Sequence, residues 1–244
     1  MPFRKVIGNI VGPSGRRLIW RVEAKFFARP YRQRLNGMRA IEVGGPTDLF
    51  GDAGSLPIYS CLRSIDNVNY STHTLWQSEA VRFRETLVCE GAALPVNDAA
   101  YDCVFSSHSL EHLANPIKAL LEWRRVICDC GLLLLVLPNR HFTFDWRRPV
   151  TSLDHLRDDF KHDTPETDLF HLDEILALHD LSRDPPAGTQ EQFKERCLRN
   201  VEFRAMHHHV FDPETAAQLL REVGFSIVRQ DVKEVDIITL ASKS

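Results

Sequence analysis

The sequence predicts a doubly wound α/β fold, in which helices cover both faces of a mostly parallel sheet. Short apolar strand patterns alternate with helical patterns from residue 39 to residue 137, and such alternation is typical of parallel sheets. The segment Arg39–Val43 reads as a buried strand that runs into Gly44 and Gly45. In such folds this turn presents backbone N–H groups to a nucleotide-like ligand.

The glycine turn also indicates the kind of ligand. Gly44 and Gly45 allow backbone angles that other residues avoid, and a ligand can lie against their main chain. Glu42 comes just before them, and a carboxylate there repels phosphate but suits a cation or a hydroxyl group. The turn therefore favours a positively charged, ribose-bearing ligand such as S-adenosylmethionine (SAM). Gly-Gly-Pro is also common in plain turns, so this motif alone decides little.

The other elements follow in chain order. An irregular or helical stretch is expected at 47–53, and a helix with an apolar face at 116–128. Asp212-Pro213-Glu214 is typical of a helix start, and Gly224 of its end. The expected strands are 39–43, 62–66, 85–89, 101–106, 132–137, 225–232 and 235–241, the last two forming a hairpin. The polar, acidic stretch 139–205 interrupts this rhythm and predicts a loop-rich inserted lid.

Composition limits the class of protein. With 244 residues, of which 43% are hydrophobic, the chain can form one well-packed domain with an insertion. It has no run of 18 apolar residues, so we expect no transmembrane helix. The six cysteines are scattered without a Cys-x-x-Cys pair. We interpret them as reduced residues of a cytoplasmic protein rather than as disulfides or zinc ligands.

Residues 1–37 form a basic arm on an acidic body. Residues 1–34 contain nine Lys or Arg and one acid, although the whole chain has a net charge of −3. Apolar residues such as Trp20 and Phe26 alternate with arginines there. One interpretation is an amphipathic helix that makes peripheral contact with a membrane surface. The favoured interpretation is a helix that packs on the domain, and an Arg-rich transit peptide is a third.

Four segments follow predicted strands at one edge of the sheet. The first is the glycine turn. Asp66 ends the second strand, 22 residues after Gly44, a spacing at which an acid meets ribose hydroxyls in dinucleotide folds. Glu90–Pro95 and Ser106–Leu113 follow the next two strands. In an open α/β sheet these carboxyl ends form the ligand crevice.

The segment Tyr101–Leu113, together with Asn115-Pro116 and Glu122–Val126, resembles the class I SAM-dependent methyltransferases, specifically the broad type 11 group. The resemblance implies a Rossmann-like, seven-stranded, mostly parallel sheet with an antiparallel last strand, helices on both faces and an inserted lid. The chain would then comprise the arm at 1–37 and a methyltransferase-like domain at 38–244, with the insertion at about 139–205.

The resemblance also implies the cofactor site. Its SAM-binding residues are Glu42, Gly44 and Gly45 for the methionine part, Asp66 for the ribose, Glu90 and Gly91 for the adenine, and Ser106 and Ser107 beside the sulfonium. One feature departs from the family pattern. Pro46 and Asp48 stand where later glycines are usual, and Pro46 removes a backbone donor. A SAM-binding but non-catalytic member therefore stays an alternative.

Histidines are the candidate catalytic groups. Methyl transfer from a sulfonium is a direct displacement, so a protein mainly aligns the acceptor and excludes water. An oxygen or nitrogen acceptor can also need a base, which histidine supplies near neutral pH. His108 and His112 are candidates, although His112 could equally pack the helix. Glu111 is expected to be structural or solvent-facing.

Eight of the eleven histidines fall within residues 141–209. His155 and Asp159, four residues apart, would share a cation in one interpretation. A solvated polar lid is favoured, and no metal site is predicted. His207 and His209 are the lid's catalytic candidates, because alternate residues of a strand share a face.

The leading hypothesis is a cytoplasmic SAM-dependent methyltransferase with a small-molecule or glycan acceptor, a sugar hydroxyl first. A nicotinamide oxidoreductase is disfavoured, because Gly-x-Gly-x-x-Gly is missing and the chain ends in a hairpin. Nucleic acid is a poor partner for the acidic body, which also lacks an Asn-Pro-Pro-Tyr type of base-flipping motif.

Overall fold

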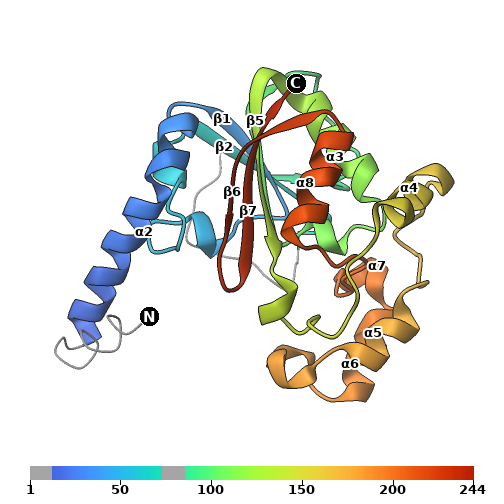
Figure 1. The fold of residues 1–244 in the computed structure, drawn as a ribbon. Coiled ribbons are helices and arrows are strands. Elements are labelled where there is room, and N and C mark those ends of the chain that lie inside the picture. Colours follow the sequence, from blue (N-terminus) through green and yellow to red (C-terminus); the bar gives the residue numbers. More distant parts are fainter. Residues whose placement is uncertain (1–12, 73–85) are drawn as a thin grey trace.

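The protein folds around a seven-stranded sheet (Figure 1). A computed structural model describes residues 13–72 and 86–244. In spatial order the strands are β3 (Thr86–Val88), β2 (Ser64–Asn69), β1 (Arg39–Val43), β4 (Tyr101–Ser107), β5 (Ile127–Pro138), β7 (Asp236–Lys243) and β6 (Phe225–Val232). Strands β1 to β5 are paired in parallel, and β7 runs antiparallel to both of its neighbours. The predicted fold class is confirmed.

Helices cover both faces of this sheet, with an apolar core beneath each. On one face α3 (Pro116–Val126) and α8 (Pro213–Glu222) pack against the strands around Trp123, which is fully buried. On the other face the carboxyl-terminal half of α2 (Pro13–Leu35) packs through Tyr31 and Leu35. Figure 1 shows α2 on one side of the sheet and α3 with α8 on the other. The core layers hold the strand ends in a fixed arrangement.

The starts of α3 and α8 follow from local chemistry. The side chain of Asn115 accepts a hydrogen bond from the backbone N–H of Lys118, and Asp212 accepts one from Thr215 at 2.7 Å. Each helix then has proline in its first turn. Proline is tolerated there, because the N–H groups of the first turn have no partner within the helix. Gly224 has a φ of +84° just after α8. The predicted bounds of this helix are confirmed.

Two predicted boundaries are wrong. Strand β2 continues to Asn69, whereas the polarity of the sequence placed its end at Asp66. Strand β5 begins at Ile127 through a register shift opposite Tyr101–Cys103, so the segment before Leu132 is a bulge rather than a free turn. Gly131 is required there, because an added Cβ would lie 2.6 Å from the carbonyl oxygen of Asp102.

The insertion, residues 139–205, contains four short α-helices joined by loops and single 3₁₀ turns, whereas the sequence predicted no helices there. Its helices are α4 (Leu153–His162), α5 (Leu172–Leu178), α6 (Gln190–Leu198) and α7 (Asn200–Phe203). They surround a small apolar cluster that includes Ile175, Phe193 and Met206. Such short helices repeat too few times for a clear periodicity in the sequence. They lie at one end of the molecule (Figure 1).

Single turns of 3₁₀ helix complete the described secondary structure. These are η1 (Asp48–Phe50), η2 (Tyr59–Cys61), η3 (Leu110–His112), η4 (Arg140–Phe142), η5 (Leu181–Arg183) and η6 (Pro185–Ala187). Turns η1 and η3 follow strands β1 and β4 closely, so they lie at the edge of the sheet where the ligand crevice was predicted.

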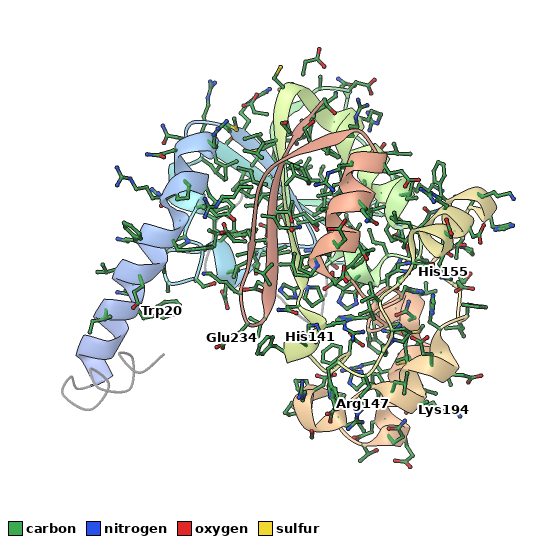
Figure 2. All side chains as sticks on the ribbon, viewed as in Figure 1. Trp20, His141, Arg147, His155, Lys194 and Glu234 are labelled. Atoms are coloured by element: carbon green, nitrogen blue, oxygen red, sulfur yellow. The ribbon has the colours of Figure 1, made fainter. Side chains whose placement is uncertain are left out.

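The amino-terminal half of α2 extends beyond the sheet, with Trp20 near its end (Figure 2). Ile19, Trp20, Val22 and Phe26 are exposed, whereas Phe27 is half-buried. The favoured interpretation, a helix that packs on the domain, holds for the carboxyl-terminal half only. Arg4 and Lys5 of the arm lie outside the described residues. Among the helices described, none is long and apolar enough to span a membrane.

Candidate functional site

A pocket of about 570 Å³ lies at the carboxyl ends of the central strands. Its floor comes from β1, β2 and β4 and from the turns that follow them, and its wall comes from the insertion and the segment after it. The lining residues that the argument uses are Gly44, Asn69, Gly91, Ser107, His108, Glu111, His112 and His207. This is the edge at which open α/β sheets bind ligands.

The glycine turn forms one side of the pocket. Gly44 has a φ of +84°, and its N–H donates to the carbonyl oxygen of Val68 at 2.8 Å. A Cβ at Gly44 would lie 1.8 Å from Oγ of Ser109, and one at Gly45 would lie 2.2 Å from Cδ of Glu42. Both positions therefore require glycine. The close approach leaves bare backbone facing the pocket at Gly44, as a cofactor cradle needs.

Glu42 supports this turn from below and is absent from the described pocket lining. Its side chain is fully buried, and the hydroxyl of Tyr59 donates to Oε2 at 2.6 Å. The same hydroxyl accepts a bond from the N–H of Thr47. Burial raises the pKa of Glu42 to about 8, against the smaller lowering effect of the Tyr59 bond. The carboxyl thus holds the turn in shape, rather than meeting the ligand as the sequence suggested.

Asn69, rather than Asp66, occupies the end of β2. Asp66 lies inside the strand with its carboxylate accepting a bond from the Tyr101 hydroxyl at 2.9 Å. The expectation that Asp66 meets ribose hydroxyls loses its basis, because the side chain is buried away from the pocket lining. Asn69 lines the pocket, and its amide donates to the carbonyl oxygen of Gly45.

Four expected cofactor residues remain, Glu90 with Gly91 and Ser106 with Ser107. In each pair one residue lines the pocket and the other does not. Gly91 lines the pocket, whereas Glu90 is exposed and forms an ion pair with Arg204 at 2.6 Å. Ser107 lines the pocket with a buried hydroxyl that has no hydrogen-bond partner among the described residues. Ser106 is fully buried behind it. Ser106 and Ser107 differ because successive residues of a strand, here β4, point to opposite sides.

His108 follows β4 with a left-handed φ of +49°, a conformation that non-glycine residues adopt mainly where the surroundings enforce it. Its Nε2 lies 2.9 Å from Oδ1 of Asp236. Burial acts to lower the pKa of His108, but the Asp236 bond and the charge of Glu111 outweigh it and raise the pKa. His108 therefore bridges β4 to the start of β7 at the rim of the pocket.

Glu111, His112 and His207 form the polar centre of the pocket. Glu111 is fully buried, and neither carboxylate oxygen has a hydrogen-bond partner within the described part of the chain. Glu111 was expected to be structural or solvent-facing, and its burial excludes the solvent-facing position. The rings of His112 and His207 meet edge to face, with centroids 4.5 Å apart. One ligating atom from each of the three residues lies within 4.8 Å of the others.

Both imidazoles are held by their Nδ1 atoms. Nδ1 of His112 donates to the carbonyl oxygen of Met206 at 3.0 Å, and Nδ1 of His207 donates to Asp145 at 2.5 Å. Burial, and the neighbouring His207, lower the pKa of His112 well below its usual value. Burial would raise the pKa of Asp145, but His207 and Arg148 lower it to about 2. Asp145 was missed, because 62 residues separate it from His207.

His209 lies in a second cluster, apart from His207. Its Nε2 is 3.6 Å from Oδ2 of Asp159, and its ring neighbours His155 and His171. Nε2 of His155 lies 2.9 Å from Nε2 of His171 and 3.4 Å from Asp159. The expectation that His207 and His209 share a face is wrong, because the segment is not a strand.

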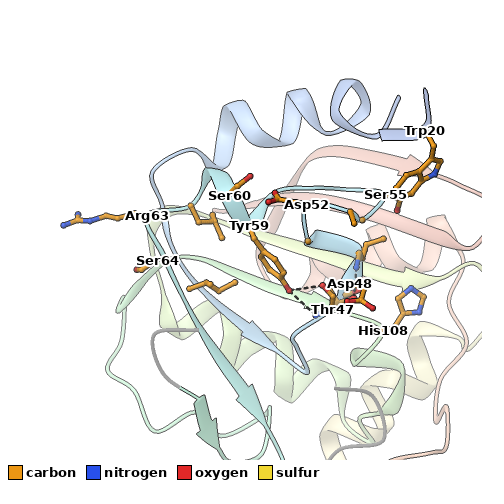
Figure 3. Close-up of a pocket in the computed structure, with 17 residues that line it drawn as sticks. Trp20, Thr47, Asp48, Asp52, Ser55, Tyr59, Ser60, Arg63, Ser64 and His108 are labelled. Atoms are coloured by element: carbon orange, nitrogen blue, oxygen red, sulfur yellow. Dashed lines mark hydrogen bonds between the residues drawn. The ribbon is translucent and has the colours of Figure 1, made fainter. Parts of the chain in front are cut away.

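A second, more open hollow of about 1290 Å³ adjoins the pocket. Figure 3 shows it between α2 and the segment after β1, with Trp20 and His108 on one side of the view and Arg63 on the other. Thr47, Asp48, Ser107 and His108 line both cavities. The hollow therefore reaches the glycine turn from the side of α2.

Comparison with known proteins identifies the class. Residues 52–135 match the family model described as a methyltransferase domain. Together with the strand order β3-β2-β1-β4-β5-β7-β6, this match identifies residues 52–135 as similar to a methyltransferase domain, and SAM is the cofactor of such a domain. The residues of the pocket fit this cofactor, because Gly44 exposes its backbone to the pocket. A Cβ at this position would collide with Ser109. No curated protein matches the sequence.

Solved structures are similar only at a low level. A SAM-dependent methyltransferase from Aquifex aeolicus is 14% identical, with 98% of each chain covered and a TM-score of 0.47. One from Methanosarcina mazei is 16% identical, with 88% of this chain and 96% of that chain covered and a TM-score of 0.49. The Burkholderia thailandensis 1,6-didemethyltoxoflavin-N1-methyltransferase, with S-adenosylhomocysteine bound, is 14% identical, with 95% and 83% covered and a TM-score of 0.47.

Proposed function

We propose that this methyltransferase transfers the methyl group of SAM to a hydroxyl oxygen of a small polar acceptor, with a sugar or glycan as the first candidate. The observation that carries the proposal is the polar centre formed by Glu111, His112 and His207 in the same pocket as the glycine turn. Arg196 and Arg204 also line this pocket. Both arginines are already paired with acids, but an apolar acceptor would leave the carboxylate of Glu111 without a hydrogen-bond partner, at a cost in free energy.

We assign the cofactor to the strand ends. The bare backbone at Gly44 would carry the methionine part, and Asn69 would face the ribose at the end of β2. Gly91 would lie beside the adenine, and Ser107 would direct its hydroxyl toward the reacting centre. SAM supplies an already activated methyl group. The chain's own residues orient the acceptor and exclude water, which is where most of the rate enhancement of such a displacement arises.

The proposed acceptor side is formed by the insertion and the segment after it. His112 is neutral at physiological pH, so its Nε2 offers a lone pair to an acceptor hydroxyl. Asp145 fixes the ring of His207 through Nδ1. In this proposal residues 139–205 act as the acceptor-binding part of the domain at 38–244.

We also propose that the arm makes peripheral contact with an anionic membrane surface in the cytoplasm. Trp20 and Phe26 are exposed on α2 beside Arg21 and Lys25. The hollow of Figure 3 is lined by Trp20 and by His108, which also lines the pocket. This arrangement would suit an acceptor sugar that is linked to a lipid. All six cysteines are described and none forms a disulfide, as a reducing compartment requires.

The alternative is a protein that binds SAM without transferring the methyl group. Two observations favour it. Pro46 removes a backbone donor from the turn, and the end of β2 has the amide of Asn69 where a carboxylate would bind ribose more tightly. Both changes weaken cofactor binding, but neither touches the polar centre of the pocket.

The proposal is tested by calorimetric titration of the full chain with SAM and with NAD. We expect SAM binding and no NAD binding. Gly44→Asp should lower SAM affinity at least about hundredfold, because it puts a side chain and a negative charge into the cradle. Gly37→Asp is the matched control, since Gly37 also has a positive φ but has open space around it.

The control variant should bind SAM as the unchanged protein does. Failure of the folded protein to bind SAM would overturn the cofactor assignment in this pocket. Equal SAM binding by Gly44→Asp and Gly37→Asp would show that the ligand lies elsewhere. Tight SAM binding without methylation of any acceptor in a panel of sugars and glycans would favour the non-catalytic alternative.

A further inference from the structure

The polar centre of the pocket has an arrangement that proton transfer alone does not explain. Glu111 presents two buried oxygens without a hydrogen bond to any described residue, and Nδ1 of His108 lies 3.7 Å from Oε1. Burying an unpaired carboxylate costs several kcal/mol, so such groups are normally paired or bind a metal ion. The ligating atoms of Glu111, His112 and His207 nevertheless gather within 4.8 Å of one another.

The hydrogen bonds of the two histidines determine which atoms face the pocket. Each ring donates Nδ1–H to an acceptor outside the cluster, Met206 for His112 and Asp145 for His207. The Nε2 atoms are left for the cavity. Metal-bound histidines have this same arrangement, because a carboxylate or carbonyl at the second nitrogen fixes the tautomer and makes the first a stronger ligand.

A carboxylate and two imidazole lone pairs that lie within 4.8 Å of one another repel one another, and a cation between them removes this repulsion. A proton on one imidazole would remove this repulsion only through a hydrogen bond to Glu111. Among the described residues, no hydrogen bond joins Glu111 to either ring. A cation satisfies all three groups at once.

We propose that Glu111 and the Nε2 atoms of His112 and His207 bind a divalent transition-metal ion, with its remaining coordination positions open to the pocket. Two nitrogens and one carboxylate suit Mn²⁺, Fe²⁺, Co²⁺ or Zn²⁺, whereas Mg²⁺ and Ca²⁺ prefer oxygen ligands throughout. Three protein ligands with open positions are typical of catalytic rather than structural metal sites.

The proposed metal site also indicates which acceptors the pocket would bind. This conclusion rests on the proposed function. Open positions on the ion would bind two neighbouring oxygens, so the acceptor carries vicinal hydroxyls or a hydroxyl beside a carbonyl. Coordination lowers the pKa of the bound hydroxyl, whose proton leaves to solvent. The oxygen then forms the new O–CH₃ bond as the S–CH₃ bond breaks, with that electron pair staying on sulfur. The products are a methyl ether and S-adenosylhomocysteine.

The second histidine cluster is a weaker metal site. Nε2 of His155 and Nε2 of His171 lie 2.9 Å apart, so one ring donates a hydrogen bond to the other. Burial, and the charge of His155, lower the pKa of His171 to about 4, so that ring is the neutral acceptor. The pair joins α4 to the start of α5 and does not line the pocket. These residues serve as controls.

The test is titration of the metal-free full chain with Co²⁺, followed by visible absorption and calorimetry. We expect one Co²⁺ per chain and a rise in Tm. Glu111→Gln, His112→Gln and His207→Gln should each weaken Co²⁺ binding at least about hundredfold, since loss of an outer-shell partner alone costs about 10–100-fold. His155→Gln and His171→Gln should leave Co²⁺ binding unchanged.

Two results would overturn the proposal. One is a wild-type chain, folded by circular dichroism, that binds no Co²⁺ at micromolar concentrations. The other is Co²⁺ binding that is lost in His155→Gln or His171→Gln but retained in His207→Gln. The wild-type titration decides the first point even if a variant fails to fold. SAM titration of the same samples separates this outcome from failure of the proposed function, because Gly44 and Asn69 bind SAM without the metal ligands.

Discussion

Glu42 and Tyr59 show how a single buried pair shapes the cofactor turn. The Tyr59 hydroxyl donates to Glu42 and also accepts from Thr47, so it links the strand to the far side of the turn. Since Oε1 of Glu42 has no partner among the described residues, the protonated carboxyl is the more stable form in the fold. The raised pKa of Glu42, about 8, expresses this preference.

We predict that stability falls with rising pH because of this residue. The ordinary pKa of Glu42 is 4.5 and its folded pKa is about 8. Between these values the unfolded chain releases the proton while the folded chain keeps it, so the free energy of unfolding decreases by about 1.4 kcal/mol per pH unit. Glu42→Gln, which resembles the protonated form, should lack this decrease. Urea unfolding at pH 5 to 9 measures the difference, and parallel profiles for the two proteins would contradict it.

At the scale of elements, the parts that were predicted correctly are those with local causes. The apolar run Arg39–Val43 and the start of α8 at Asp212 match their predicted bounds. The predicted end of β2 was wrong because Asp66 is polar but buried inside the strand. A hydrogen bond from Tyr101, 35 residues away, satisfies its carboxylate there. The polar centre was missed in part for the same reason. His207 acquires its role from Asp145, and no short-range pattern reveals contacts across 62 residues.

Helix α2 carries four exposed large apolar side chains, Ile19, Trp20, Val22 and Phe26. Phe26 is 76% exposed and Val22 is 60% exposed, on a helix that also carries Arg21, Lys25 and Arg29. Apolar side chains beside basic ones suit the boundary between lipid headgroups and acyl chains. The rest of α2 packs on the sheet, so the domain would be held near the surface.

We predict that the full chain sediments with vesicles containing phosphatidylglycerol and much less with pure phosphatidylcholine, and that salt weakens this binding. The double variant Trp20→Ser and Phe26→Ser should reduce binding about tenfold. Val201→Ser is the control, because Val201 is 52% exposed on α7, which lies away from α2 (Figure 1). Equal sedimentation with both vesicle types would remove the proposed membrane contact.

For the whole molecule, Arg148 connects the insertion to the catalytic pocket. Its guanidinium is 1% exposed. It donates to Asp145 at 3.1 Å, to Glu174 of α5 at 2.8 Å and to the carbonyl oxygen of His207 at 2.8 Å. A single side chain therefore joins three segments that are distant in sequence. The position of His207 beside His112 depends on the folding of the insertion as a unit.

We predict that Arg148→Met loosens the insertion while the sheet stays folded. Removing one partner of a buried charge pair costs about 3–5 kcal/mol. Asp145 would keep only its bond to His207, and the carbonyl oxygen of His207 would lose the donor Arg148. Hydrogen exchange should accelerate in α5 and in residues 205–209, and Co²⁺ binding should weaken. Strands β1 and β4 should keep their protection, since their core does not include Arg148.

Arg147→Met provides the matched control for this experiment. Arg147, the neighbouring residue, lies on the insertion (Figure 2). It is 45% exposed, and its guanidinium lies 3.4 Å from the carboxylate of Asp180. An exposed ion pair of this kind contributes about 0–1 kcal/mol, so its hydrogen exchange should match that of the unchanged protein. In Arg148→Met, hydrogen exchange could instead become faster by the same factor in the sheet and in the insertion. That result would mean that the sheet and the insertion unfold together. The insertion would then be part of one cooperative domain, and Arg148 would stabilise the whole fold rather than position His207.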